Sequence, residues 1–263
     1  MNTSSRGMGK EIVTENEKEN ENPKANATAT ATATAEDSFV LRVLEETEDW
    51  LEKAVIGLNL CPFAQSVWRQ GSLRMALYGG DSQEEALERL GQEITYLMQV
   101  SSTPQTPQTP QTTQTPQNIP NAILNPPKDG VSKEVHLSPE TTLPVTTLLV
   151  LPNVCADFWD FLSLVQSAQR LLKAKRAVGQ LQIAHFHPHY QFAHTEINDP
   201  ENYTNRSPYP TLHLLREADI EWATEHHPDV SQIYQNNVTR LNQMGHAGWA
   251  QLGLKSQAKW PKD

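Results

Sequence analysis

The sequence is poor in cysteine and has no long run of apolar residues. Its two cysteines, Cys61 and Cys155, are too few for a disulfide framework, which favours a reducing cytoplasm as the location. No stretch approaches the roughly 18 consecutive apolar residues of a membrane-spanning helix. The N-terminal segment also lacks the apolar core of a secretory signal. These absences predict a soluble, cytoplasmic protein with no membrane partner.

Basic residues and glycine-rich loops are scarce as well. Lys and Arg number 21 against 31 Asp and Glu, for a formal charge of -10, and no basic stripe is visible. Phosphate backbones attract the opposite charge, so we do not expect nucleic acid as a partner. The sequence has no glycine-rich phosphate loop, no dinucleotide fingerprint and no Gly-x-Ser-x-Gly elbow. It therefore assigns no cofactor and no resident metal.

Two segments carry too few apolar residues to fold. Residues 1–35 combine a Glu, Asn and Lys run with an Ala-Thr repeat, and residues 101–142 hold four copies of Thr-Pro-Gln. Proline removes backbone donors and favours extended, solvated chain. We expect both segments to be disordered. Residues 36–245 should then form one domain, interrupted by the insertion at 101–142 and followed by a C-terminal tail at 246–263.

The remaining sequence alternates between helical and strand periodicity. Expected helices cover 38–56, 61–69, 82–98 and 157–175 and begin again at 218 and 228, while expected strands cover 73–78, 145–151, 181–186 and 211–215. A capping box of Ser82 and Glu85 begins the third helix, and Gly245 is expected to stop the last one. This order predicts an α/β (α+β) fold, with a mixed sheet of about four strands covered by helices.

The long segment 187–210 has neither period, yet it is too aromatic for disorder. Loops of this length are usually functional or disordered, and ordered loops at strand ends commonly carry sites. A planar guanidinium fork makes Arg206 a candidate anion ligand. The alternative is a structural arginine that ties the loop to carbonyls and to Glu217 or Asp199. The candidate ligand-binding residues of the loop are Tyr190, Tyr203, Asn205, Arg206 and Ser207.

Three runs of residues carry a specific resemblance to a known family. They are Ala-Val-Ile-Gly-Leu-Asn-Leu-Cys-Pro-Phe-Ala at 54–64, Phe-His-Pro-x-Tyr-Gln-Phe at 186–192 and Asn-Tyr-Thr-Asn-Arg-Ser-Pro-Tyr-Pro-Thr-Leu-His-Leu-Leu-Arg-Glu at 202–217. Over about residues 40–245, without the insertion, the chain resembles the family catalogued as domain of unknown function 1415. The resemblance implies a compact, mainly bacterial domain without an established activity, and it transfers no catalytic residue. His185 and His189 depart from its pattern, while the candidates that match it are Cys61, His187, Arg206 and His213.

Cys61 is the sharpest single candidate for chemistry. It precedes a proline that is expected to start a helix, where free N–H groups and the helix dipole favour a thiolate. Cys61 would then act as a nucleophile or redox thiol, with His187 or His213 as a general base. The alternative is a small buried hydrophobic residue, since free cysteine is among the most buried residue types.

Three classes of function therefore stay open. The first is a small enzyme that acts on an anionic small molecule through Cys61, His187 or His213, and Arg206. The second is a non-enzymatic module that presents the 187–210 loop to a ligand or a protein. The third is a metal-binding protein, because His185 and His187 share one face of a strand, although no third ligand is dictated. Reaction class, substrate and oligomeric state do not follow from the residues.

Overall fold

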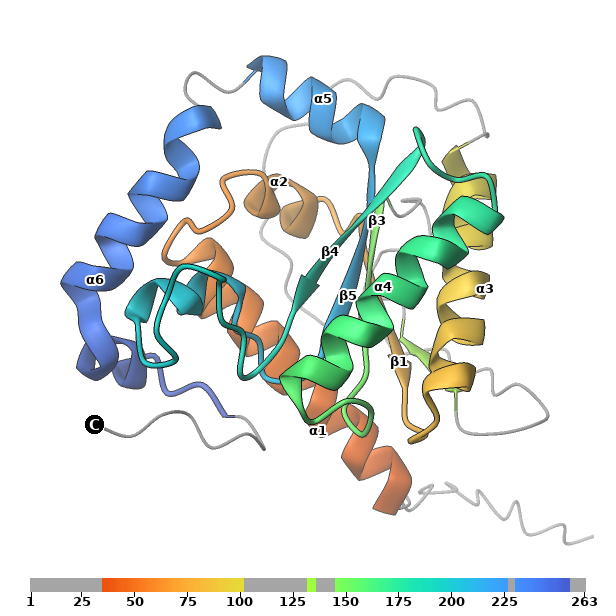
Figure 1. Ribbon diagram of the computed structural model, residues 1–263, viewed down its shortest axis with the longest axis horizontal. Coiled ribbons are helices and arrows are strands. Elements are labelled where there is room, and N and C mark those ends of the chain that lie inside the picture. Colours follow the sequence, from red (N-terminus) through yellow and green to blue (C-terminus); the bar gives the residue numbers. More distant parts are fainter. Residues whose placement is uncertain (1–34, 102–131, 136–144, 227–229, 256–263) are drawn as a thin grey trace, which may run out of the picture. The chain divides into compact units, whose positions relative to one another are not determined.

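The computed structural model describes residues 35–101, 132–135, 145–226 and 230–255 (Figure 1). The strands are β1 (Leu73–Tyr78), β2 (Ser132–Val135), β3 (Thr146–Val150), β4 (Leu181–Phe186) and β5 (Thr211–Arg216). The α-helices are α1 (Ala35–Trp50), α2 (Ala64–Arg69), α3 (Gln83–Ser101), α4 (Phe158–Ala174), α5 (Glu217–His226) and α6 (Ile233–Gln251). Shorter elements are the π-helix η1 (Leu51–Ile56) and the 3-10 turns η2 (Pro200–Asn205) and η3 (Val230–Gln232).

Four strands form a mixed sheet in the order β1-β3-β5-β4, and β2 adds to its β1 edge. Strand β1 runs parallel to β3, whereas β5 is antiparallel to both β3 and β4. This confirms the expected α/β fold with a mixed sheet of about four strands covered by helices. Strand β2 falls inside the 101–142 stretch for which we expected disorder. The rest of that stretch after Ser101, and residues 1–34, lie outside the described residues.

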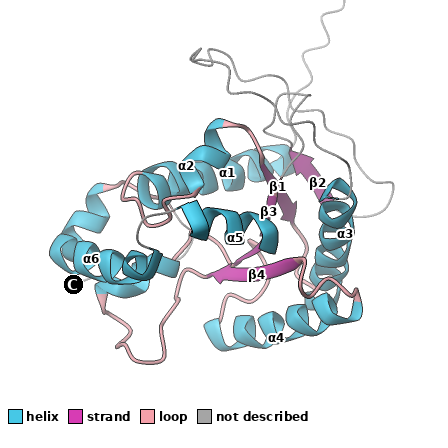
Figure 2. Ribbon diagram, turned by 90° about the horizontal axis from the view of Figure 1, so that it is seen from above, coloured by secondary structure: helices cyan, strands magenta, loops and turns pink. Residues whose placement is uncertain are grey.

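Two hydrophobic clusters lie on the two faces of the sheet. One packs α3 and α4 against the sheet around Leu90, Leu149 and Phe161, and the other packs α1 and η1 against it around Trp50 and Leu148. Figure 2 shows α3 and α4 on one side of the strands and α1 and α2 on the other. Because both faces are covered, every residue of β1 is buried, whereas the sequence suggested an alternating strand.

Helix α3 begins much as its sequence predicts. The backbone N–H of Glu85 donates to the Ser82 hydroxyl at 3.3 Å, which is one half of the expected capping box. The Glu85 carboxylate does not return to the cap. It accepts a 2.6 Å hydrogen bond from the hydroxyl of Tyr78 on β1 instead. This hydrogen bond joins the start of α3 to the sheet. Burial and the carboxylate raise the pKa of Tyr78 to about 12.

The regular first part of the last helix stops at Gly245, as expected. Gly245 has φ 61° and ψ -174°, a backbone conformation that is nearly restricted to glycine, and a second helical segment follows it after a kink. Beyond the kink, Trp249 is buried and stacks on Tyr203 with ring centroids 4.2 Å apart. Residues 246–251, which the sequence assigned to a tail, therefore extend α6 and pack on η2.

Candidate functional site

His187 joins the long loop to the turn that precedes α4. Its side chain is fully buried, its Nδ1 accepts the backbone N–H of His189 at 3.0 Å, and its Nε2 lies 2.9 Å from the Cys155 carbonyl oxygen. Nδ1 is an acceptor, so Nε2 carries the proton and donates it to that carbonyl. Burial lowers the pKa of His187 to about 4. A neutral, buried ring with both nitrogens engaged holds backbone in place and has no position free for a general base.

Arg206 is buried and clamps two loop segments together. Its Nε donates to the Tyr190 carbonyl at 3.1 Å and its Nη2 to the Ile197 carbonyl at 2.5 Å, with the guanidinium over the Tyr203 ring. The side chain is fully buried, and burial lowers the pKa of its guanidinium. As a structural arginine would, Arg206 binds backbone carbonyls of the loop, although neither Glu217 nor Asp199 takes part. The geometry therefore favours the structural alternative over the anion ligand for Arg206.

The other ligand-binding candidates of the loop also bond within the protein. Asn205 donates to the His185 carbonyl at 3.2 Å, and the Ser207 hydroxyl donates to the Tyr209 carbonyl at 2.6 Å. The Tyr203 hydroxyl lies 2.8 Å from Nδ1 of His246 on α6. Tyr190 packs against Phe158, and burial raises the pKa of its hydroxyl. These side chains stabilise the loop, because backbone N–H and C=O groups outside a β-sheet or helix need other hydrogen-bond partners.

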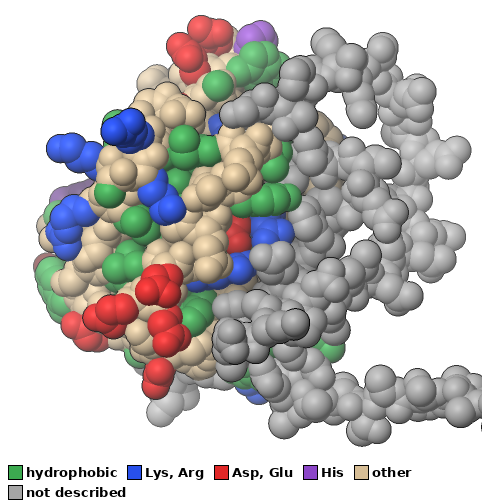
Figure 3. Space-filling model, turned by 90° about the vertical axis from the view of Figure 1, so that its right-hand side faces the viewer, with side chains coloured by type: hydrophobic (Ala, Val, Ile, Leu, Met, Phe, Trp, Pro, Cys, Tyr) green, Lys and Arg blue, Asp and Glu red, His purple; other side chains and the backbone are tan. Residues whose placement is uncertain are grey.

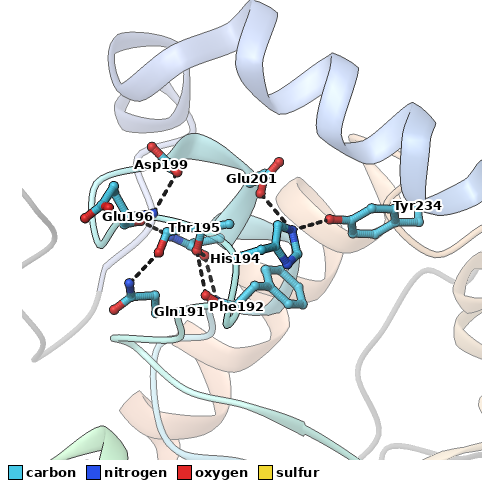
Figure 4. A network of polar contacts seen from close by, with 9 residues as sticks. Gln191, Phe192, His194, Thr195, Glu196, Asp199, Glu201 and Tyr234 are labelled. Carbon is cyan, nitrogen blue, oxygen red and sulfur yellow. Dashed lines mark hydrogen bonds and ion pairs between the residues drawn. The ribbon is translucent and has the colours of Figure 1, made fainter.

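A second polar network fastens this loop to α6 (Figure 4). The Asn202 side-chain oxygen accepts from the backbone N–H of Phe192 and from the Thr195 hydroxyl, at 3.0 and 2.7 Å. Next to it, the His194 ring bonds the Tyr234 hydroxyl at 2.8 Å and lies 3.2 Å from the Glu201 carboxylate. Hydrogen bonds thus connect the loop to α6.

Cys61 lies just before α2, but its environment does not favour a thiolate. Helix α2 begins at Ala64, and the N–H groups of Phe63 and Ala64 lower the pKa of the thiol less than burial raises it. The side chain packs against the hydrophobic cluster of α1 and η1. We expected the start of α2 to lower the pKa of Cys61, but burial raises it. Burial also raises the pKa of the other free thiol, Cys155, to about 11, with help from Asp160 and Asp157.

His213 lies on β5 and is held by its neighbour on β3. The Thr146 hydroxyl donates to the Leu214 carbonyl at 2.7 Å, so it accepts the Nε2 proton of His213, also at 2.7 Å. Burial lowers the pKa of His213 to about 4. Its ring neighbours Phe186 of the α1 cluster, whereas His187 contacts Phe161 of the α4 cluster. The two histidines therefore lie against opposite layers.

Cys61, His187, His213 and Arg206 do not converge on a shared cleft. None of them lines either of the two clefts described below. Within the described ranges, no group of three or more His, Cys, Asp or Glu residues is placed to hold a metal ion. In the same ranges, no helix is long and apolar enough to cross a membrane.

A polar cleft of about 280 Å³ lies between the loop after η1 and the first half of α6. In Figure 1 this loop, in orange, reaches toward α6. The Asn237 amide donates to the Leu60 carbonyl at 2.8 Å, and the Arg240 guanidinium donates to the Leu58 carbonyl, so two α6 side chains define one wall. The lining residues are Asn59, Pro62, Ile233, Asn236, Asn237, Thr239, Arg240 and Gln243.

The loop that forms the other wall has unusual backbone. Residues Leu51–Ile56 form a π-helix, a conformation that is rare and frequent at functional sites. A Cβ atom at Gly57 would lie 2.4 Å from the Lys53 carbonyl oxygen, so this turn requires glycine for space. Asn59 has φ 51°, in the left-handed region that non-glycine residues seldom adopt. Irregular backbone of this kind aims the Asn59 side chain and the Leu58 and Leu60 carbonyls at α6.

The sequence reasoning missed this cleft, although two signals were present. Asn59 and Pro62 belong to the first run that resembles the family, on either side of Leu60 and Cys61. Asn236, Arg240 and Gln243 recur at helical spacing on α6, and such a stripe is typical of a solvated helix face. The contact between the 57–62 loop and α6 shows that this face of α6 lines a cleft. A solvated helix face would have the same residue pattern.

A second depression of about 540 Å³ lies between α3 and α4, with Leu87, Tyr96 and Leu171 among its lining residues. Figure 3 shows this side of the molecule, where hydrophobic side chains are exposed among basic and acidic groups. Its cationic side chain, Lys175, donates to the Thr95 hydroxyl at 3.1 Å. This groove is largely apolar, and its cation is engaged within the protein.

Comparison with known proteins gives a family match without a functional precedent. The profile of a family described as "Protein of unknown function (DUF1415)" matches residues 42–113 and 129–251, well over half of the chain. No curated protein matches the sequence, and no solved structure matches it.

Proposed function

The chain belongs to the DUF1415 family, and we propose that it is a non-enzymatic ligand-binding module whose cleft between the Gly57–Pro62 loop and α6 holds an anionic small molecule. The observation that carries this proposal is the cleft itself. Uncharged hydrogen-bonding groups and one guanidinium line it, without a carboxylate. The proposal places the protein in the cytoplasm, where its two free cysteines stay reduced.

A binding function fits this site better than catalysis does. General acid-base catalysis needs a group whose pKa lies near the working pH, and nucleophilic catalysis needs an activated nucleophile. The cleft lining contains no His, Cys, Asp, Glu, Lys or Tyr side chain. Burial lowers the pKa values of His187 and His213 to about 4 and raises that of Cys61, each away from what its role in the enzyme hypothesis needs. Amides and a guanidinium can hold and orient a ligand without transferring a proton.

A thermal-shift screen of metabolites on the full chain tests the proposal. A ligand that binds the native state at about 100 times its Kd adds about 2.7 kcal/mol, which raises Tm by at least about 5 °C in a protein of this size. The variant Thr239→Glu places a carboxylate in the cleft and should abolish the shift. Its control is Thr224→Glu on α5, a similarly exposed helical position outside the cleft, which should keep the shift.

Two outcomes would contradict the proposal. The first is a ligand that stabilises Thr239→Glu as strongly as the wild type, because that ligand binds elsewhere. The second is a ligand that is chemically turned over by the wild type and not by Cys61→Ser. That result would restore the thiol as a catalytic group and favour the enzyme over the module.

A further inference from the structure

The charge of the cleft is set by one side chain. Of its lining residues, Arg240 alone is charged, and it comes from the exposed face of α6. One N–H of its guanidinium donates to the Leu58 carbonyl, which fixes the direction of the group. Within the described part of the chain, no carboxylate forms an ion pair with Arg240 and no other acceptor engages its remaining donors. A guanidinium held in this way presents its fork to an incoming carboxylate or phosphate.

Uncharged polar groups surround this guanidinium on both walls. Asn59 projects from the loop, while Asn236, Thr239 and Gln243 share the face of α6 that carries Arg240. Each amide offers two donors and one carbonyl acceptor, and the hydroxyl both donates and accepts. Hydroxyl groups on a ligand have the same dual character. The lining therefore suits a body rich in hydroxyl groups better than a hydrocarbon.

The size of the cleft and its lack of aromatic lining residues limit the chemical class of the ligand further. Its volume of about 280 Å³ is close to the lower end of ligand pockets. From Asn236 to Gln243 the polar stripe rises about 10 Å along the helix. No aromatic side chain lines the cleft, so a nucleobase or flat ring has no stacking partner there. Ile233 and Pro62 supply a small apolar surface for the C–H groups of a ligand.

We infer that the ligand is a small polyhydroxylated anion, with its single carboxylate or phosphate on Arg240 and its hydroxyl groups on the amides of Asn59, Asn236 and Gln243. This inference rests on the proposed function, because it names the chemical class of the ligand of that cleft. The carboxylate and phosphate forms share the same recognition, so probes of both kinds are needed.

Side-chain amide signals in a ¹H–¹⁵N NMR titration of the full chain provide a direct test. The probes are gluconate and glucose 6-phosphate, with glucose as the neutral polyol and acetate and inorganic phosphate as anions without hydroxyl groups. We expect at least one of the first two probes to shift the amide signals of Asn59, Asn236 and Gln243. Its affinity should exceed those of glucose and of the matching simple anion by about tenfold or more, since its anionic group and its hydroxyl groups both contribute to binding. The better of the two identifies the anionic group.

Two variants test the anchor and its surroundings. Arg240→Gln removes the charge but keeps a polar side chain, and Asn236→Asp adds a like charge beside the anion. Each should weaken the binding of the better probe by about tenfold or more. Arg170→Gln, at an exposed arginine of α4 outside the cleft, should leave the affinity unchanged.

The failures of the inference and of the proposed function are distinguishable. If anions without hydroxyl groups shift the cleft amides and neither charged polyol does, the cleft binds an anionic ligand but the inferred class is wrong. A shift by neutral or cationic metabolites alone would contradict the proposed function as well. Equal affinities for glucose and glucose 6-phosphate would overturn the anchoring role of Arg240. If no probe moves the cleft amides while a screened metabolite shifts residues elsewhere, both the inference and the proposed cleft function fall.

Discussion

The side-chain amide of Asn237 on α6 donates to the carbonyl of Leu60 at 2.8 Å, and this buried hydrogen bond joins segments 177 residues apart. It holds the two walls of the proposed cleft at a fixed separation. The loop on one side contains part of the run that resembles the family, and the helix on the other carries the polar stripe. The contact therefore connects the stability of the α6 attachment with the shape of the cleft.

Replacing this donor by an acceptor should destabilise the protein. In Asn237→Asp the side chain keeps its size, but a carboxylate faces the Leu60 carbonyl, and a buried charge is left unpaired. We expect the free energy of unfolding at pH 7 to fall by about 2 kcal/mol or more. Asn236→Asp, at the exposed neighbouring position, should change it by less than about 0.5 kcal/mol. Urea melts of the two variants decide this, and equal losses would mean that the Leu60 contact contributes nothing specific.

The regular elements were predictable because their signals are local. Strand β4 was expected at 181–186 and forms at Leu181–Phe186, and α4 starts after Asp157, whose carboxylate accepts from the backbone N–H groups of Trp159 and Asp160. Periodicity and capping are read within a few residues, and they suffice for such elements. The mixed sheet followed from their order.

The site was not predictable in the same way. Whether Arg206 binds a ligand or two backbone carbonyls depends on where Tyr190 and Ile197 end up in the fold, and no local pattern encodes that. The π-helix before Gly57 also has no local signal, because the helical periodicity expected over 38–56 continues through it. Residue types alone could not separate functional polar groups from structural ones, because burial and partners decide between them.

Acid should weaken the protein partly through His187. The pKa of its buried ring is about 4, below the 6.5 of an unstructured histidine, so the unfolded chain binds this proton more tightly. Its contribution to stability is therefore complete above about pH 6.5 and is lost as the pH falls toward 4, by up to roughly 3 kcal/mol. His213 shifts in the same direction and adds to this loss.

The comparison of melts at pH 7.5 and 4.5 isolates this effect. His187→Gln should lose less stability between the two values than the wild type, whereas His226→Gln, at an exposed position of α5, should behave like the wild type. In the folded wild type, the His187 ring signals should not titrate between pH 8 and 5.5. A ring that titrates near 6.5 in the native protein would contradict both expectations.

The conservative change Arg206→Lys should be far from neutral. Lysine keeps the charge but cannot reach the Tyr190 and Ile197 carbonyls with two in-plane donors, which leaves a buried acceptor unpaired. The free energy of unfolding should fall by about 2 kcal/mol. Arg170→Lys on the surface of α4 should change it by less than about 0.5 kcal/mol. Near-normal stability of Arg206→Lys, with loss of ligand binding, would instead restore Arg206 as an anion anchor.

Neither cysteine should behave as an activated thiol in the native protein. Burial raises the pKa of both Cys61 and Cys155, so little thiolate is present at neutral pH. Alkylation by iodoacetamide at pH 7.5 should be roughly tenfold or more slower than for a free thiol, and it should still accelerate above pH 9. Mass spectrometry of each single-cysteine variant separates the two sites. Fast labelling of Cys61 that levels off below pH 8 would reverse the assignment and reopen the nucleophile hypothesis.

Two tryptophans test whether the end of α6 belongs to the folded core. Trp249, beyond the Gly245 kink, is 3% exposed and stacks on Tyr203, whereas Trp222 on α5 is 63% exposed. Truncating a buried aromatic side chain costs about 3 to 5 kcal/mol, because apolar contact is lost and a cavity remains. Trp249→Ala should therefore lower the free energy of unfolding by an amount in that range. Trp222→Ala should change it by less than about 0.5 kcal/mol. If residues 246–251 were instead the tail that their sequence suggests, both variants would be as stable as the wild type. The 187–210 loop would then support α6 and its cleft through the His194–Tyr234 contact.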